Sequence, residues 1–253
     1  MKKTLIAAAV VALSLSSAAN AAFVSTVDLF STNQARITDS TVGGTFVSSQ
    51  VSTGGTDIIG GYRDIGVNLI TNGGDSDNAA RIGVNAGRLS FSVDSQSTGS
   101  GFARWDGVNS GAAINTTGLG GLSLGGTAFN LEILFSDAGF RFDLEAYTSS
   151  TQWSKIQLIS AAHATPFNSV ISFGAFGLCG FNNGFVVVSC GAGGAVDFAN
   201  LGALQAIIDP LGGSTAVDLS LGQVTTVPEP TSLALIGLGL LGAGALRRRR
   251  TAK

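Results

Sequence analysis

Histidine, cysteine, proline and charged residues are all scarce in this chain. A single histidine, His163, occurs in 253 residues, and no cysteine or carboxylate motif accompanies it at the spacing of a zinc site. The sequence has no Gly-x-Ser-x-Gly elbow and no glycine-rich phosphate loop of the usual form. These absences exclude a zinc centre, a histidine-based catalytic triad and a phosphate-loop nucleotide site, so we expect His163 to be a surface residue.

Basic residues become scarcer still when the two ends of the chain are set apart. The whole sequence has 14 Lys+Arg and 16 Asp+Glu, but its ends hold seven of the basic residues and one acid. The part between them therefore has 7 basic and 15 acidic residues, a net charge of −8. Binding of nucleic acid or anionic lipid relies on a basic surface, so we exclude nucleic acid as a partner of this part.

Helix-forming Glu and Lys are also rare in the middle of the chain, which is rich in Gly, Ser, Thr, Asn and short apolar runs. This composition favours an all-β fold, and we predict one jelly-roll-like antiparallel β-sandwich over residues 22–224. No fixed-period repeat is present, which argues against a solenoid or a propeller. The domain contains only two glutamates, Glu132 and Glu145, so we predict no catalytic residues and no enzyme.

The first residues, 1–21, have the three parts of a secretory signal peptide. Lys2 and Lys3 form a basic start, an apolar core runs from Leu5 to Leu15, and Ala19-Asn20-Ala21 supplies small residues at the cleavage site. We predict cleavage after Ala21 and export of the domain that follows.

The last segment, residues 225–253, contains a proline motif, an uncharged apolar run and a basic cluster. The motif is Val227-Pro228-Glu229-Pro230, the run is 231–246, and the cluster is Arg247, Arg248, Arg249 and Arg250. A sixteen-residue helix spans roughly 24 Å, a little less than a ~30 Å hydrocarbon core, and thinning of the bilayer and snorkelling arginines close that gap. We predict a short C-terminal transmembrane helix whose arginines stay cytoplasmic, preceded by an extended and exposed motif.

In this order and at the chain end, the three parts resemble the PEP-CTERM sorting signal of exported bacterial proteins. The resemblance covers residues 227–253 and implies recognition by an exosortase, a membrane protease-transpeptidase that removes the tail. The family occurs in Gram-negative bacteria that make extracellular polysaccharide. It implies export across the inner membrane, a transient anchor, and a final place in the periplasm, at the cell surface or in the extracellular matrix. The segments Gly60–Ile65, Trp105–Gly107 and Gly118–Leu122 also resemble a recurrent group of PEP-CTERM proteins that looks like a β-sandwich without a known activity.

Several stretches alternate between apolar and polar residues, as half-buried strands do. The clearest are 65–69, 89–93, 131–135, 140–146 and 153–159. Residues 136–139 form a four-residue turn signal, so we predict that the strands on either side pair as a hairpin, with Phe135 opposite Phe140. The glycine-rich residues 118–126 are expected to be a loop, and 201–208 fit a short helix or a strand equally.

In such a hairpin Glu132 falls directly opposite Asp143, with Glu145 nearby, and like charges in that position repel. In an ordinary solvated face, Arg141 on the same face or Lys155 on the next strand neutralises them. The alternative is a calcium site formed by Glu132, Asp143 and Glu145, because calcium prefers hard oxygen ligands. No other cofactor is predicted. Residues 72–78 look superficially like a calcium loop but lack its terminal acidic residue, so we interpret them as an Asx-rich surface loop.

Cys179 and Cys190 are the only cysteines, and export favours a disulfide between them over two free thiols. Asn183-Gly184 is a hairpin turn signal. A two-residue turn there sets Cys179 opposite residue 188, two positions short of its partner. We therefore expect a bulge or a longer loop in this hairpin.

These features predict a non-enzymatic envelope or extracellular-matrix protein associated with a biofilm or exopolysaccharide. The main alternative is a carbohydrate-binding module that stacks Trp105 or Trp153 on a sugar ring. A polysaccharide hydrolase and an ice-binding protein are further alternatives. For ice binding, the threonines from Thr41 to Thr56 are too irregular to form a flat array.

Overall fold

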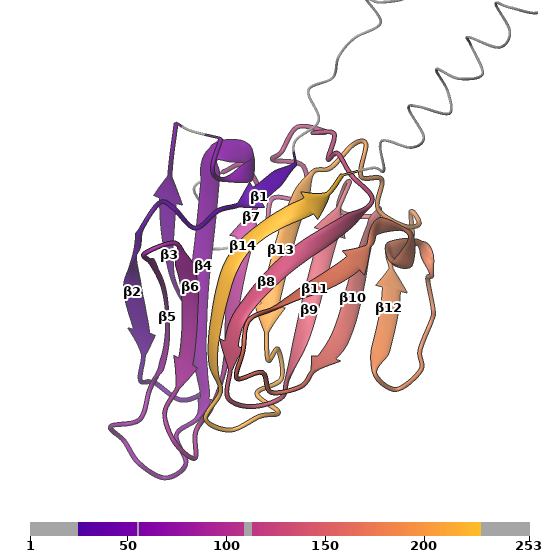
Figure 1. The fold of residues 1–253 in the computed structure, drawn as a ribbon. Helices are drawn as coiled ribbons and strands as arrows, with labels where there is room; N and C mark the ends of the chain where they lie inside the picture. The colour runs from indigo at the N-terminus through magenta and orange to yellow at the C-terminus, as the bar shows by residue number, and fades with distance from the viewer. Residues whose placement is uncertain (1–24, 55, 109–112, 229–253) are drawn as a thin grey trace, which may run out of the picture.

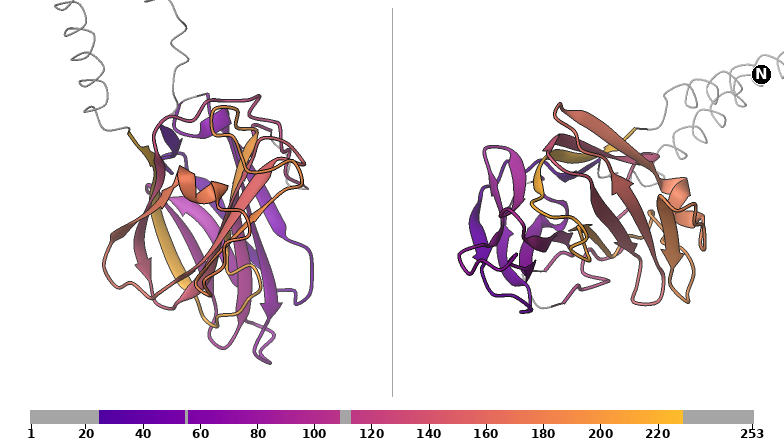
Figure 2. Two further views of the ribbon diagram at one scale, coloured as in Figure 1. Left: turned by 90° about the vertical axis from the view of Figure 1, so that its right-hand side faces the viewer. Right: turned by 90° about the horizontal axis from the view of Figure 1, so that it is seen from below.

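The computed structural model describes residues 25–228 apart from residue 55 and residues 109–112, and these residues form two antiparallel β-sheets packed face to face (Figure 1). The predicted all-β sandwich is therefore confirmed. Figure 2 shows the same two layers from the side and from below. The predicted signal peptide, the predicted transmembrane helix, the arginine cluster, Glu229 and Pro230 lie outside the described residues. Within the described ranges, no helix is long and apolar enough to cross a membrane.

Sheet I has seven strands, six of them in one row with β1 paired to β14. Across the sheet they are β11 (Phe167–Ser172), β8 (Ala128–Ser136), β14 (Asp218–Val227), β6 (Arg88–Val93), β5 (Ala80–Asn85) and β2 (Gln34–Asp39), with β1 (Thr26–Asp28) beside β14.

Sheet II also has seven strands. Their order is β12 (Val186–Cys190), β10 (Trp153–Ser160), β9 (Phe140–Tyr147), β13 (Ala203–Ile208), β7 (Thr98–Trp105), β4 (Tyr62–Thr71) and β3 (Val47–Ser52). Two short 3-10 helices, η2 (Ile59–Gly61) and η3 (Phe173–Gly177), complete the described elements.

Alternating apolar residues turn inward from both sheets and form the core. Ile65, Val67 and Leu69 of β4 are all fully buried, and Leu89 and Phe91 of β6 are almost as inaccessible. Burying a side chain of this size contributes about 1.5–3 kcal/mol, which is why the alternation in the sequence predicts the strands so well. Residues 201–208, which fitted a helix or a strand, contain β13, and most of 118–126 is irregular, as expected for a loop.

The predicted hairpin between residues 131–135 and 140–146 is wrong. β8 pairs with β11 and β14 in sheet I, whereas β9 pairs with β10 and β13 in sheet II. The residues between them, 137–139, cross from one sheet to the other. Both arms of such a crossing turn apolar residues toward the same core, so alternation alone cannot distinguish it from a hairpin. β9 pairs instead with β10, the next strand in the sequence.

The chain enters and leaves the sandwich at the same end. Thr26 of β1 pairs with Thr225 of β14, and the carbonyl of Ser25 accepts a 2.8 Å hydrogen bond from the N–H of Thr226. β14 continues to Val227, past the predicted domain boundary at residue 224. The first residue of the proline motif is therefore the last residue of a strand. Pro228, directly after it, is exposed, as predicted.

Candidate functional site

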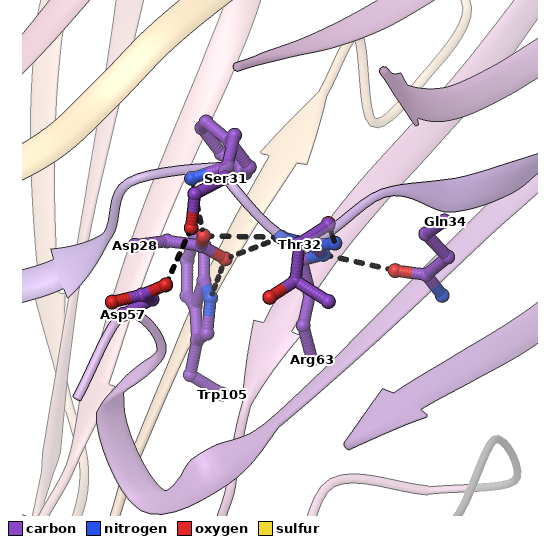
Figure 3. A network of polar contacts seen from close by, with 8 residues as sticks. Asp28, Ser31, Thr32, Gln34, Asp57, Arg63 and Trp105 are labelled. Carbon is purple, nitrogen blue, oxygen red and sulfur yellow. Dashed lines mark hydrogen bonds and ion pairs between the residues drawn. The ribbon is translucent and has the colours of Figure 1, made fainter. Parts of the chain in front are cut away.

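Asp28 lies at the centre of a polar network buried between the sheets (Figure 3). Its carboxylate accepts hydrogen bonds from the N–H of Phe30 (2.7 Å) and from the indole N–H of Trp105 (2.8 Å). Nη1 of Arg63 contacts both carboxylate oxygens, at 3.0 and 3.1 Å. Burial raises the pKa of Asp28, and the neighbouring Arg63 guanidinium opposes that rise.

Arg63 reaches this network from β4 and satisfies its remaining donors on sheet I and the loop beside it. Nε donates to Oε1 of Gln34 (2.9 Å), and Nη2 donates to the carbonyl of Thr32 (2.6 Å). Neither Asp28 nor Arg63 is accessible to solvent, so the network stabilises the sandwich instead of meeting a ligand. Trp105 is 2% exposed, which removes it as a sugar-stacking residue.

The outer face of sheet II, on the other side from the core, brings together polar side chains that are far apart in the sequence. The strand register places Arg104 of β7, Gln205 of β13, Glu145 of β9 and Lys155 of β10 in one row across four neighbouring strands. The alternation in β9 indicates which of its residues face outward. No sequence pattern indicates that β13 lies beside β9, so the row itself was not predicted.

Two aromatic rings lie at one end of this face. Tyr147 and Trp153 are paired across β9 and β10, their ring centroids are 6.2 Å apart, and both side chains are partly exposed. The Tyr147 hydroxyl donates a 2.7 Å hydrogen bond to Oε2 of Glu145. Burial and the adjacent Glu145 carboxylate raise the pKa of Tyr147, so the phenol remains a neutral donor. We refer to Glu145, Tyr147, Trp153 and Lys155 as the outer platform.

A chain of hydrogen bonds joins the outer platform to the middle of sheet II. Nε of Arg104 donates to Oε1 of Gln205 (2.7 Å), and Nε2 of Gln205 donates to Oε2 of Glu145 (3.3 Å). The guanidinium of Arg104 lies 4.6 Å from the ring centre of Phe102, and burial lowers its pKa. Among the described residues, buried Nη1 of Arg104 has no hydrogen-bond partner.

Asp143 lies on the same outer face, in the row next to Glu145. Its Oδ2 accepts a 2.8 Å hydrogen bond from Gln157 and is 3.8 Å from Nζ of Lys155. Oδ1 is buried and has no hydrogen-bond partner in the described part of the chain. Burial raises the pKa of Asp143, and Gln157 and Lys155 oppose that rise.

The premise of the predicted calcium site is wrong, because its three carboxylates do not share a face. Glu132 is on β8 in sheet I, where its Oε2 accepts a hydrogen bond from the N–H of Gln223, whereas Asp143 and Glu145 are on β9 in sheet II. The structure shows no group of three or more His, Cys, Asp or Glu able to hold a metal within the ranges it describes. Lys155 lies beside Asp143, as expected of a neighbouring cation, but the Asp143 side chain is only 3% exposed, so this carboxylate is not on a solvated face.

The other candidate loops are held by local contacts. In the loop 72–78, Asn72 and Asp75 accept hydrogen bonds from the N–H groups of Gly74 and Asp77, which are the bonds of Asx turns. His163 is half-buried at the crossing between β10 and β11, with its ring 3.7 Å from that of Phe167.

The predicted disulfide between Cys179 and Cys190 is present, with a Cα–Cα distance of 5.4 Å. An antiparallel β-bridge pairs Asn182 with Val187, so the turn between them has four residues, 183–186, instead of two. This longer loop moves the register by two positions and sets the cysteines opposite each other, which confirms the expected departure from a two-residue turn.

The proline motif at the end of β14 has a match among known families. Residues 226–250 match the family described as the PEP-CTERM protein-sorting motif. The chain carries a PEP-CTERM sorting motif. This motif implies export with a membrane-anchored sorting signal in Gram-negative bacteria, and it marks the chain as a substrate targeted to exosortase. Its first two residues, Thr226 and Val227, belong to β14.

No curated protein matches the chain. One similar solved structure is the family 11 carbohydrate-binding module from Clostridium thermocellum in complex with a β-1,3-1,4-mixed-linked tetrasaccharide. The two are 8% identical over 78% of this chain and 98% of the module, with a TM-score of 0.33.

Proposed function

We propose that this protein is a non-catalytic component of the bacterial envelope or extracellular matrix, processed by exosortase, and that it binds extracellular polysaccharide through the outer platform. The sorting motif supports the first part of the proposal. The second part rests on one observation, the partly exposed Tyr147–Trp153 pair beside hydrogen-bonded polar side chains.

A sugar ring has apolar C–H faces and a rim of hydroxyl groups, so its binding site needs both kinds of contact. Tyr147 and Trp153 offer apolar ring surface, and large aromatic side chains dominate the energetics of many binding surfaces. Glu145 supplies an acceptor, and Lys155, which is partly exposed, supplies a donor for hydroxyl oxygens. Because the Glu145 carboxylate lies between the cations Arg104 and Lys155 in this row, the face suits a neutral glycan better than a strongly charged one.

The arrangement of carboxylates supports binding over hydrolysis. Glycoside hydrolysis needs two carboxyl groups on opposite sides of one bond. Glu132 and Glu145, the two glutamates of the domain, lie on different sheets. Glu145 is already hydrogen-bonded to Tyr147 and Gln205.

Binding of the exported protein to neutral and acidic polysaccharides, measured by affinity electrophoresis and on a glycan array, tests this proposal. We expect Tyr147→Ala and Trp153→Ala each to weaken binding by at least about tenfold, the equivalent of 1.4 kcal/mol. The matched control is Phe185→Ala, which removes a 71% exposed aromatic ring outside the outer platform. Equal binding by all three variants would refute the assignment of the site.

Processing is tested separately by the intact mass of protein recovered from cells. We expect a mature form that lacks residues 1–21 and the apolar tail and whose cysteines are oxidised. A protein recovered with both ends intact contradicts the exosortase part of the proposal and leaves the binding measurements unaffected.

A further inference from the structure

A cavity of about 190 Å³ lies between the two sheets, near the side of the sandwich where β11 is the edge strand of sheet I and β12 is the edge strand of sheet II. Its walls come from both layers and are mostly apolar. They include Leu131 and Ile133 of β8, Phe142 of β9, Leu158 of β10 and Leu221 of β14. The cavity is therefore distinct from the outer platform, which is on the opposite surface of sheet II.

The neighbouring part of the same edge is closed by aromatic rings. Phe129 of β8 is surrounded by Phe173, Phe176 and Phe198, whose ring centroids are 4.9, 5.8 and 5.6 Å away. The next inward positions of β8 are those of Leu131 and Ile133, which face the cavity instead. The space between the sheets is thus filled by phenylalanine rings around Phe129, whereas beside Leu131 and Ile133 it is left as a cavity.

The cavity lining also includes three polar residues, Ser160, His163 and Ser169, together with the 53% exposed Ile159, and we call this part of the lining the mouth. Backbone contacts hold it in place. The N–H of His163 donates to the carbonyl of Ser136 (2.7 Å), and the N–H of Ser136 donates to the carbonyl of His163 (2.8 Å). The imidazole and the two hydroxyls can each donate or accept a hydrogen bond at the boundary between the apolar interior and solvent.

We propose that this cavity binds a small amphiphile, with a ring-sized apolar group between the sheets and a polar end at Ser160, His163 and Ser169. A cavity of about 150 Å³ lined by Leu, Ile and Phe binds benzene, so about 190 Å³ holds such a ring and a short substituent. The polar mouth selects a ligand with a hydroxyl or carboxylate end over a pure hydrocarbon. This proposal does not depend on polysaccharide binding.

Benzyl alcohol and hexanoate are the probes, because they carry the same kind of polar end on an aromatic ring and on an acyl chain. Each is titrated into exported protein recovered from cells, and binding is followed through methyl NMR signals of the leucine and isoleucine side chains that line the cavity. We expect saturable shifts with at least one probe. The preferred probe then indicates whether the ligand is aromatic or acyl.

Two neighbouring positions on β11 give a matched pair of variants. Ser169 pairs with Leu131 and faces the cavity, whereas Val170 pairs with Asn130 and is 60% exposed. Ser169→Phe should fill the mouth and weaken binding more than tenfold, and Val170→Phe should leave it unchanged. Ser169→Leu is a smaller substitution that serves the same purpose if the phenylalanine prevents folding. Absence of saturable shifts with both probes, or equal binding by the Ser169 variants and the parent protein, would overturn the proposal.

Discussion

Nη1 of Arg63 lies 3.0 Å from Oδ1 of Asp28, and both side chains are completely buried. Arg63 belongs to β4 of sheet II, while Asp28 belongs to β1, which pairs with β14 of sheet I. The ion pair therefore connects the two layers of the sandwich. It also holds the first described strand against the core, with Trp105 hydrogen-bonded to the same carboxylate.

Removing only one partner of this pair should destabilise the protein strongly. Arg63→Met leaves the Asp28 carboxylate buried without its cation, and we expect a loss of about 3–5 kcal/mol in the free energy of unfolding, measured in urea. The double variant Asp28→Leu/Arg63→Met should recover much of that loss. Arg81→Met is the control, because its ion pair with Asp94 is partly exposed and should contribute at most about 1 kcal/mol. A similar small effect at Arg63 would contradict the assigned role.

Reduction of the disulfide should weaken the fold to a moderate extent. Cys179 and Cys190 are 11 positions apart, and closing a loop of this size stabilises by roughly 3 kcal/mol in the chain-entropy model. Urea unfolding of the oxidised protein, the reduced protein and the Cys179→Ser/Cys190→Ser variant measures this contribution. The last two should agree with each other. Two reactive thiols in the denatured exported protein would show that the bond is not formed in cells.

The two tryptophans should respond differently to a bound polysaccharide. Trp105 is buried in the core, whereas Trp153 is partly exposed on the outer platform. We expect the ligand-induced change in fluorescence to persist in Trp105→Phe and to disappear in Trp153→Phe. The opposite result would place the binding site away from the outer platform.

The Asp143 carboxyl should make stability depend on pH. Burial raises its pKa in the folded protein. Between the ordinary pKa of an aspartate and this raised value, the folded protein binds more protons than the unfolded chain, so its stability increases as the pH falls. We expect the stability advantage of the parent protein over Asp143→Asn to grow from neutral to mildly acidic pH. An advantage that shrinks on acidification would refute the direction of the shift.

The inner faces of the strands were predictable from the sequence because they depend on local alternation. The alternation of Ile65, Val67 and Leu69 with polar residues was sufficient to predict that these three side chains are buried in the core. The disulfide between Cys179 and Cys190 could be predicted from the expected export of the domain and from the position of the turn between the two cysteines. The PEP-CTERM motif was recognised because its parts are contiguous.

Features that depend on which strands lie side by side were not predictable in this way. The strand after Phe135 crosses to the other sheet, so Glu132 and Asp143 never meet. Trp105 and Trp153 are each flanked by polar residues in the sequence, but Trp105 lies in the core and Trp153 on a surface. The row from Arg104 to Lys155 exists only because β13 inserts between β7 and β9.

The pairing of Thr26 with Thr225 has a consequence for how the protein is displayed. If the chain is anchored beyond Pro228, the domain is held at one end and the strands run lengthwise away from the anchor. The turns at 72–78, 137–139 and 209–217 then become the most distant points. The outer platform with Trp153 and the cavity mouth beside Ser169 are then both accessible to molecules that approach the domain from its sides.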